Sequence, residues 1–131
     1  MKKLIFDTNF LMIPIQFRVD IFSEIQRIIP THKLCIYQSS VEELKRLLEM
    51  SKGKDKKAVQ FALKLISLKN IKVLDSKGTY ADRAILENLD HNSIIATQDR
   101  QLRDKILEKG SSVLILRQKE YLKLVERKLY K

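Results

Sequence analysis

KLIFD, residues 3–7, is a short apolar run that ends at a carboxylate, Asp7. An apolar run of this length is typical of a buried strand. Four more short apolar runs follow along the chain, at Lys33–Tyr37, Ile71–Leu74, Ser93–Thr97 and Val113–Leu116. We predict that all five runs are strands of one sheet.

The segments between and after these runs have apolar residues at helical spacing. Asp20 is expected to cap the first helix, Ser39 or Ser40 the second, and Gly110 to follow the end of the fifth. Lys52–Lys57 is expected to be a charged link. The predicted helices are Val19–Ile29, a segment around Val41–Leu48, Ala58–Leu68, Thr79–Leu89, Gln98–Glu108 and Lys119–Tyr130.

Short apolar runs that alternate with amphipathic helices predict βαβ units, and therefore an α/β fold in which helices cover both faces of a mainly parallel sheet. The chain has 131 residues and shows no repeat or linker, so we expect a single domain, 1–131. The lone cysteine, Cys35, lies inside an apolar run and is expected to be a buried side chain in a reducing cytoplasm.

The formal net charge of +10 favours a nucleic-acid partner, because Lys and Arg bind phosphates and release counterions. The alternative is a Lys-rich surface that only keeps the protein soluble. The longest apolar stretches are too short for a membrane span.

Four acidic residues follow the predicted strands or open the helices after them: Asp7, Glu43, Asp82 and Asp99. In parallel sheets, ligands bind beyond the carboxyl ends of the strands, so these side chains are expected at one edge of the sheet. Mg²⁺ and Mn²⁺ prefer carboxylate oxygens, and such ions can activate water and neutralise charge in phosphodiester hydrolysis. Each acid also has a simpler explanation, as a strand end, a capping-box partner or an acid in the first turn of a helix.

The motifs around these acids resemble those of a known family. Their order along the chain is Asp7-Thr8-Asn9, Val41-Glu42-Glu43-Leu44, Thr79-Tyr80-Ala81-Asp82 and Ala96-Thr97-Gln98-Asp99. This order resembles the motifs of PIN-domain ribonucleases and covers essentially the whole chain. The resemblance implies a three-layer α/β/α fold with a five-stranded parallel sheet of order 3-2-1-4-5. It also implies an endoribonuclease that uses Mg²⁺ or Mn²⁺.

Within the resemblance, the four acids would be the metal-binding and catalytic set, and Asn9 and Thr97 would be polar partners that orient carboxylates or water. Two branches compete. The stretches around Asp7, Asp82 and Asp99 look more like archaeal-type stand-alone relatives of the pre-ribosomal-RNA nucleases of the small-subunit processome. VapC-type toxins, which are held by an antitoxin, are the second branch.

Arg83 departs from the family pattern, because many relatives in the favoured branch have a second acid there. Arg83 is therefore expected to touch RNA phosphate, to point away from Asp82, or to pair with Asp82 and weaken metal binding. A catalytically weak RNA- or ribosome-binding module is the alternative to an enzyme. A phosphate-receiver-like regulatory domain is a third alternative, since such domains also gather acids at strand ends. It is more distant, because such domains usually have Lys at the end of the last strand, where this chain has Arg117.

The remaining basic and apolar residues suggest further contacts. Arg100 and Arg103 flank Asp99, and they are RNA-binding candidates together with Arg83, Lys45 and Arg46. His32 and His91 are expected on the surface, away from the acids. The apolar stretch from Phe10 to Phe17, after the first strand, predicts either a buried crossover or a homodimer patch.

Overall fold

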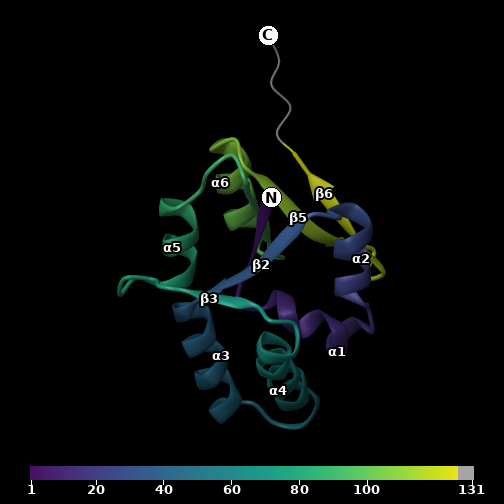
Figure 1. The fold of residues 1–131 in the computed structure, drawn as a ribbon. Coiled ribbons are helices and arrows are strands. Elements are labelled where there is room, and N and C mark those ends of the chain that lie inside the picture. The colour runs from purple at the N-terminus through teal and green to yellow at the C-terminus, as the bar shows by residue number, and fades with distance from the viewer. Residues whose placement is uncertain (127–131) are drawn as a thin grey trace.

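The computed structural model describes residues 1–126 and contains one six-stranded sheet of order β3-β2-β1-β4-β5-β6 (Figure 1). The first five strands are parallel, and β6 is antiparallel to β5. This confirms the predicted α/β fold and the order 3-2-1-4-5, to which β6 adds a strand. The strands are β1 (Lys2–Phe6), β2 (His32–Tyr37), β3 (Lys72–Leu74), β4 (Ser93–Ala96), β5 (Ser112–Arg117) and β6 (Tyr121–Val125).

Helices cover both faces of this sheet and complete three layers. One group, from η1 to α4, packs on one face, and α5 and α6 pack on the other. The helices are η1 (Phe10–Met12), α1 (Ile13–Phe17), α2 (Ile21–Ile28), α3 (Gln38–Met50), α4 (Gly53–Leu68), α5 (Ala81–Glu87) and α6 (Arg100–Glu108).

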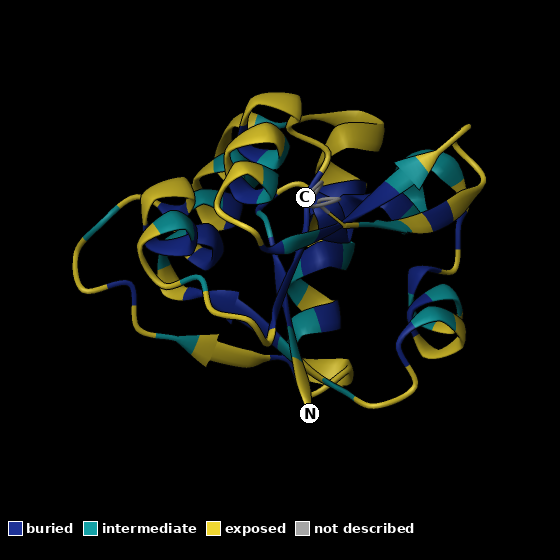
Figure 2. Cartoon of the chain, turned by 90° about the horizontal axis from the view of Figure 1, so that it is seen from above, coloured by how far each residue is buried: buried dark blue, intermediate teal, exposed yellow. Residues whose placement is uncertain are grey.

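The alternation of side chains along β1 divides the core between the two faces. Leu4 and Phe6 pack with the first group of helices, and Ile5 packs with the second. Buried residues follow the sheet and the inner helix faces, while exposed residues lie on the outer turns and loops (Figure 2). Cys35 of β2 is fully buried, as expected.

The stretch after β1 is a buried crossover. Phe10, Leu11 and Ile13 have no exposed surface and belong to the core. Ile15 and Phe17 are partly buried against the same core. Of the two expectations for this stretch, the buried crossover is confirmed, because its most apolar side chains already fill the interior of this chain.

The prediction of a helix at Lys119–Tyr130 is wrong for its described part. The chain turns back at residues 118–120 and forms β6, which pairs with β5 from Arg117↔Tyr121 to Val113↔Val125. Gln118 and Lys119 make this turn with φ of 54° and 57°, in a conformation that Gly or Asn usually supplies. The sequence therefore lacked the usual hairpin signal. Residues 127–130 of the predicted helix lie outside the described residues.

Two predicted boundaries are also wrong. α4 already begins at Gly53, so most of the expected link Lys52–Lys57 is helical. β2 runs directly into α3, which puts Ser39 and Ser40 inside its first turn with Tyr37 as the N-cap residue, and no capping box forms. The other boundaries differ by a few residues, and Asp20 caps α2 as predicted, since its Oδ1 accepts from the Ser23 N–H at 3.1 Å.

None of the helices within residues 1–126 is long and apolar enough to cross a membrane.

The strand β6 gives a direct test of the C-terminal structure. Leu122 is buried and Tyr121 is partly exposed, which fits a strand, whereas the predicted helix would bury both. We expect Leu122→Ala to lower the free energy of unfolding by about 2–5 kcal/mol, because it leaves a cavity in the core. Tyr121→Ser should change it by about 1 kcal/mol at most, as surface substitutions do. Urea unfolding of the two variants beside wild type measures both changes, and equal losses would contradict the strand.

Candidate metal centre

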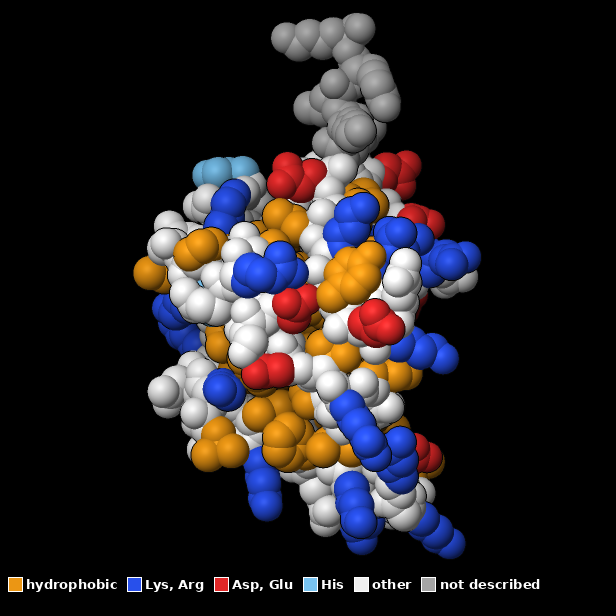
Figure 3. All heavy atoms as spheres, turned by 90° about the vertical axis from the view of Figure 1, so that its right-hand side faces the viewer, with side chains coloured by type: hydrophobic (Ala, Val, Ile, Leu, Met, Phe, Trp, Pro, Cys, Tyr) orange, Lys and Arg blue, Asp and Glu red, His pale blue; other side chains and the backbone are white. Residues whose placement is uncertain are grey.

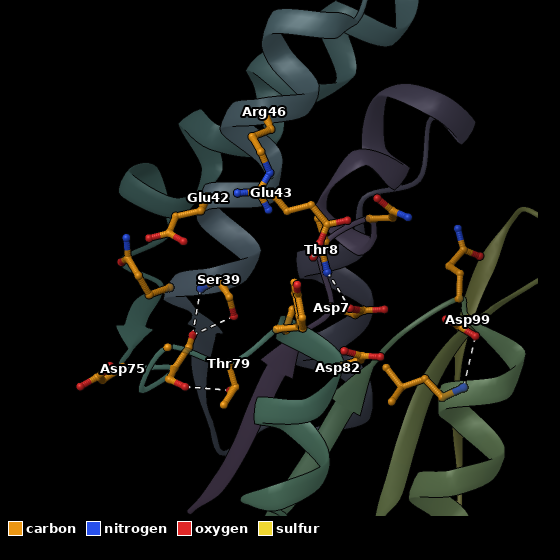
Figure 4. A pocket seen from close by; sticks show the side chains of 18 residues that line it. Asp7, Thr8, Ser39, Glu42, Glu43, Arg46, Asp75, Thr79, Asp82 and Asp99 are labelled. Atoms are coloured by element: carbon orange, nitrogen blue, oxygen red, sulfur yellow. Dashed lines mark hydrogen bonds between the residues drawn. The ribbon is translucent and has the colours of Figure 1, made fainter.

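A cleft of about 1270 Å³ lies at the carboxyl ends of the parallel strands, and all four predicted acids line it (Figure 4). Asp7 directly follows β1, Glu43 projects from the second turn of α3, Asp82 lies in the first turn of α5, and Asp99 is the N-cap of α6. Residues up to 92 positions apart in sequence thus reach one space, because parallel strands end on the same side of the sheet.

Asp7 is half-buried in the cleft and is held by two hydrogen bonds. Its Oδ1 accepts from the Thr8 N–H at 2.9 Å, and its Oδ2 accepts from the Thr97 hydroxyl at 2.9 Å. Burial is the main cause that raises the pKa of the Asp7 carboxyl above its ordinary value of 3.8, against the effect of these two bonds. The nearby charges of Asp99 and Glu43 raise this pKa further.

Two threonines connect the acids. The Thr97 hydroxyl donates to Asp7 and accepts from the Asp99 N–H at 3.0 Å, so it joins the ends of β1 and β4. The Thr8 hydroxyl donates to Glu43 Oε2 at 3.0 Å, and Thr8 is almost fully buried. Asn9 lines the cleft, but it is Thr8 that orients a carboxylate in this structure. Thr8 belongs to the Asp7-Thr8-Asn9 motif, but its contact with Glu43 was not predicted from the sequence.

The other three acids each accept hydrogen bonds through one oxygen only. Asp99 Oδ1 accepts from the N–H groups of Gln101 and Leu102, and Asp82 Oδ1 accepts from the Arg83 N–H. Glu43 uses Oε2, as described above. Among residues 1–126, the second oxygen of each of these acids accepts no hydrogen bond, so it remains available for a ligand.

The chemistry of this cleft fits a hard cation. Within residues 1–126, no group of three or more His, Cys, Asp or Glu side chains already has the spacing of a finished metal site. The donors are nevertheless carboxylates, the type that Mg²⁺ and Mn²⁺ prefer. A half-buried carboxylate that two neighbouring acids repel would be stabilised by a cation placed among them. The residues that would hold it are Asp7, Glu43 and Asp99, with Asp82 on the α5 side.

The cleft also contains residues that the sequence analysis did not select. Glu42 and Asp75 add two carboxylates to its lining, and Tyr80 lies at the cleft with 81% of its surface exposed. Ser39 and Ser76 join α3 to the loop after β3 through a 2.8 Å contact between their hydroxyls. Asp75 follows a predicted strand, which was the signal that could have identified it.

The predicted RNA-binding residues lie in the cleft, in a neighbouring pocket, or in neither. Arg46 lines the cleft, whereas Lys45 beside it does not. Arg100 and Arg103 line a neighbouring pocket. Arg83 points away from the cleft and pairs with Glu87, with 2.7 Å between Nε and Oε1, so it does not pair with Asp82.

Other basic and titratable residues lie away from the cleft. Lys and Arg side chains are spread over the face around α1, α2 and β6 (Figure 3), so the positive charge of the chain is not confined to the acidic site. His91 is exposed, and His32 is half-buried with Nδ1 2.6 Å from the Ile29 carbonyl oxygen. Neither histidine lines the cleft.

The raised pKa of Asp7 predicts a gain in stability on neutralising it. In metal-free protein at a pH above the raised folded pKa, Asp7 is ionised in both the folded and the unfolded chain, and only the folded chain carries the burial and repulsion penalty. Asp7→Asn should therefore melt at a higher temperature than wild type at pH 7. The difference should shrink as the pH falls through the raised folded pKa, because the wild-type carboxyl then takes up a proton. Thermal melts in EDTA across this range measure it.

Glu49→Gln is the matched control for this experiment, since Glu49 is an exposed acid on α3 outside the cleft. Its melting temperature should follow that of wild type at each pH. An Asp7→Asn protein that melts below wild type at pH 7 would contradict the penalty assigned to the buried charge.

The chain is similar to a known ribonuclease in sequence and to two solved structures in fold. Ribonuclease VapC4 of Methanocaldococcus jannaschii is 39% identical over 129 residues, which cover 95% of this chain and 97% of that protein. Among solved structures, the PIN domain endonuclease Utp24 aligns with a TM-score of 0.75 and 22% identity, covering 97% of this chain and 92% of that one. A domain of a functionally unknown protein from M. jannaschii aligns with a TM-score of 0.57 and 22% identity, covering 89% and 92%.

These two structural similarities support the fold, and the similarity to the ribonuclease extends over nearly the full length of both chains. The family described as "PIN like domain" matches residues 4–119, which include all four acids of the cleft. The chain therefore belongs to the PIN-like domain family.

Proposed function

We propose that this protein is a metal-dependent endoribonuclease that hydrolyses phosphodiester bonds of RNA in the cleft described above. The observation that carries the proposal is the half-buried Asp7 carboxylate, which has the charges of Glu43 and Asp99 near it in the cleft of a PIN-like fold. The 39% identity to a ribonuclease supports RNA as the substrate.

Some residues of the cleft would hold the metal ion, and others would orient its ligands. Asp7, Glu43, Asp82 and Asp99 would hold Mg²⁺ or Mn²⁺, which when bound activates water and neutralises charge on the scissile phosphate. Thr97 fixes Asp7 relative to the start of α6, and Thr8 fixes Glu43. Such supporting hydrogen bonds hold carboxylates in the orientation that a cation requires.

The comparisons favour a VapC-type role over pre-ribosomal-RNA processing. The sequence motifs pointed to the processing branch, yet the VapC relative is 39% identical, whereas Utp24 is 22% identical and supports the fold alone. We therefore propose a cytoplasmic VapC-type ribonuclease with an antitoxin partner, and retain rRNA processing as the second candidate. The alternative of a catalytically weak binding module loses one of its arguments, because Arg83 pairs with Glu87 and leaves Asp82 unpaired by any described cation.

Substitution of Asp7 tests the proposed chemistry. We expect Asp7→Asn to reduce Mn²⁺-dependent cleavage of single-stranded RNA by more than about 100-fold, since partners that only support a metal ligand already contribute about 10–100-fold. Denaturing gels of a labelled RNA, with and without EDTA, give the rate. Glu49→Gln should cleave like wild type. Cleavage by Asp7→Asn at the wild-type rate would disprove the assignment of Asp7.

Expression in a bacterial host tests the proposed role. A VapC-type toxin should slow growth when induced alone, whereas Asp7→Asn, expressed to the same level, should not. Co-expression of the gene that adjoins this one should restore growth and yield a complex that co-purifies. Normal growth in cells that contain soluble protein active on RNA in vitro would argue against the toxin role and favour the processing role.

A further inference from the structure

A second, smaller pocket of about 360 Å³ lies beside the acidic cleft at the carboxyl ends of β4 and β5 and the start of α6. Gln98 lines both spaces, so the two are neighbours. Thr97 lines the small pocket and also donates to Asp7 in the cleft. A ligand that extends out of the cleft past Gln98 would therefore reach this pocket.

Three arginines line this pocket, and no acid does. Arg100 and Arg103 are one turn apart on α6, and Arg117 comes from the end of β5. The rest of the lining is Thr97, Gln98, Ile115 and Leu116. An uncharged wall with three guanidinium groups is suited to an anion, and guanidinium forks match the geometry of phosphate oxygens.

These arginines are weakly committed to other partners. Arg103 Nε lies 3.6 Å from Asp104 Oδ1, which is beyond hydrogen-bond length. Within residues 1–126, neither Arg100 nor Arg117 forms an ion pair. By contrast, the Arg83 guanidinium is already bound by Glu87 at 2.7 Å. The pocket thus places three arginines, two of them without an ion pair among residues 1–126, next to a cleft that is rich in carboxylates.

We propose that the pocket of Arg100, Arg103 and Arg117 binds a backbone phosphate of the RNA strand that adjoins the phosphate cut in the acidic cleft. This proposal rests on the proposed function for the identity of the strand. The acidic cleft repels an RNA backbone in the absence of a cation, so a separate positive pocket supplies affinity that does not depend on metal. It also fixes the direction in which the strand leaves the cleft, past Gln98 towards β5.

Metal-free RNA binding tests the proposal without cleavage. The probe is a short oligouridine with a fluorescent label, titrated in EDTA with wild type and with the double variant Arg100→Gln/Arg117→Gln. We expect the dissociation constant of the variant to rise by about tenfold or more, as expected for the loss of a charge-assisted hydrogen bond. The slope of log K against log salt should fall by about 0.7, the value for one phosphate contact on a single strand.

Lys105→Gln/Lys109→Gln is the matched control. Like the arginine variant, it removes two positive charges, one from α6 and one from the residue that follows α6. Both lysines are exposed and lie outside the pocket. Its dissociation constant should stay within about twofold of wild type, with a smaller change in salt slope than the arginine variant. Equal weakening of RNA binding in both double variants would overturn the proposed pocket and indicate a general charge effect. Unchanged RNA binding by the arginine variant would also overturn the pocket. Thermal melts of both variants establish that they are folded.

Single-turnover cleavage with Mn²⁺ separates this proposal from the proposed function. The arginine variant should need about tenfold more protein for half-maximal rate, while its rate at saturation stays close to wild type. If wild type cleaves and the arginine variant binds as wild type does, the phosphate pocket fails alone. If wild type does not cleave but its RNA affinity depends on Arg100 and Arg117, the nuclease assignment fails and the pocket stands.

Discussion

The pairing of β1 with β4 is the constraint on which the site depends. Phe6 lies beside Ala96, and the Asp7 N–H donates to the Ala96 carbonyl at 2.9 Å, so the two strands end together. The Thr97 hydroxyl then connects Asp7 to Asp99, the N-cap of α6. A shift of this register by one residue would turn Asp7 to the other face of the sheet and separate the acids.

This constraint holds charges together that would otherwise separate. Asp7 is half-buried near two acids of the same charge, so folding places this carboxylate in an unfavourable environment when no cation is bound. The acidic cleft and the arginine pocket each gather side chains of one charge. One space is prepared for a cation and the other for an anion, and Gln98, an uncharged residue, stands between them.

Much of this arrangement could be predicted from the sequence because it depends on short-range rules. Apolar runs identified the five parallel strands, and the strand-end rule brought Asp7, Glu43, Asp82 and Asp99 to one edge. The C-terminal strand could not be recognised, because Leu122 and Val125 fit either a helix or a strand and the turn before them lacks Gly and Asn. Asn9 was predicted to orient a carboxylate or water, yet it is Thr8 that bonds Glu43; this depends on backbone geometry after β1, which residue types do not reveal.

The contact between α2 and β6 has a consequence for how the molecule meets other chains. The outward-facing Leu122 N–H of β6 donates to Glu24 Oε1 at 3.0 Å, so a helix side chain occupies a position where another strand would have to bond. The edge formed by β6 is therefore closed at that point to growth of the sheet by strand addition. Two copies cannot join their sheets through the Leu122 N–H without first breaking its bond to Glu24.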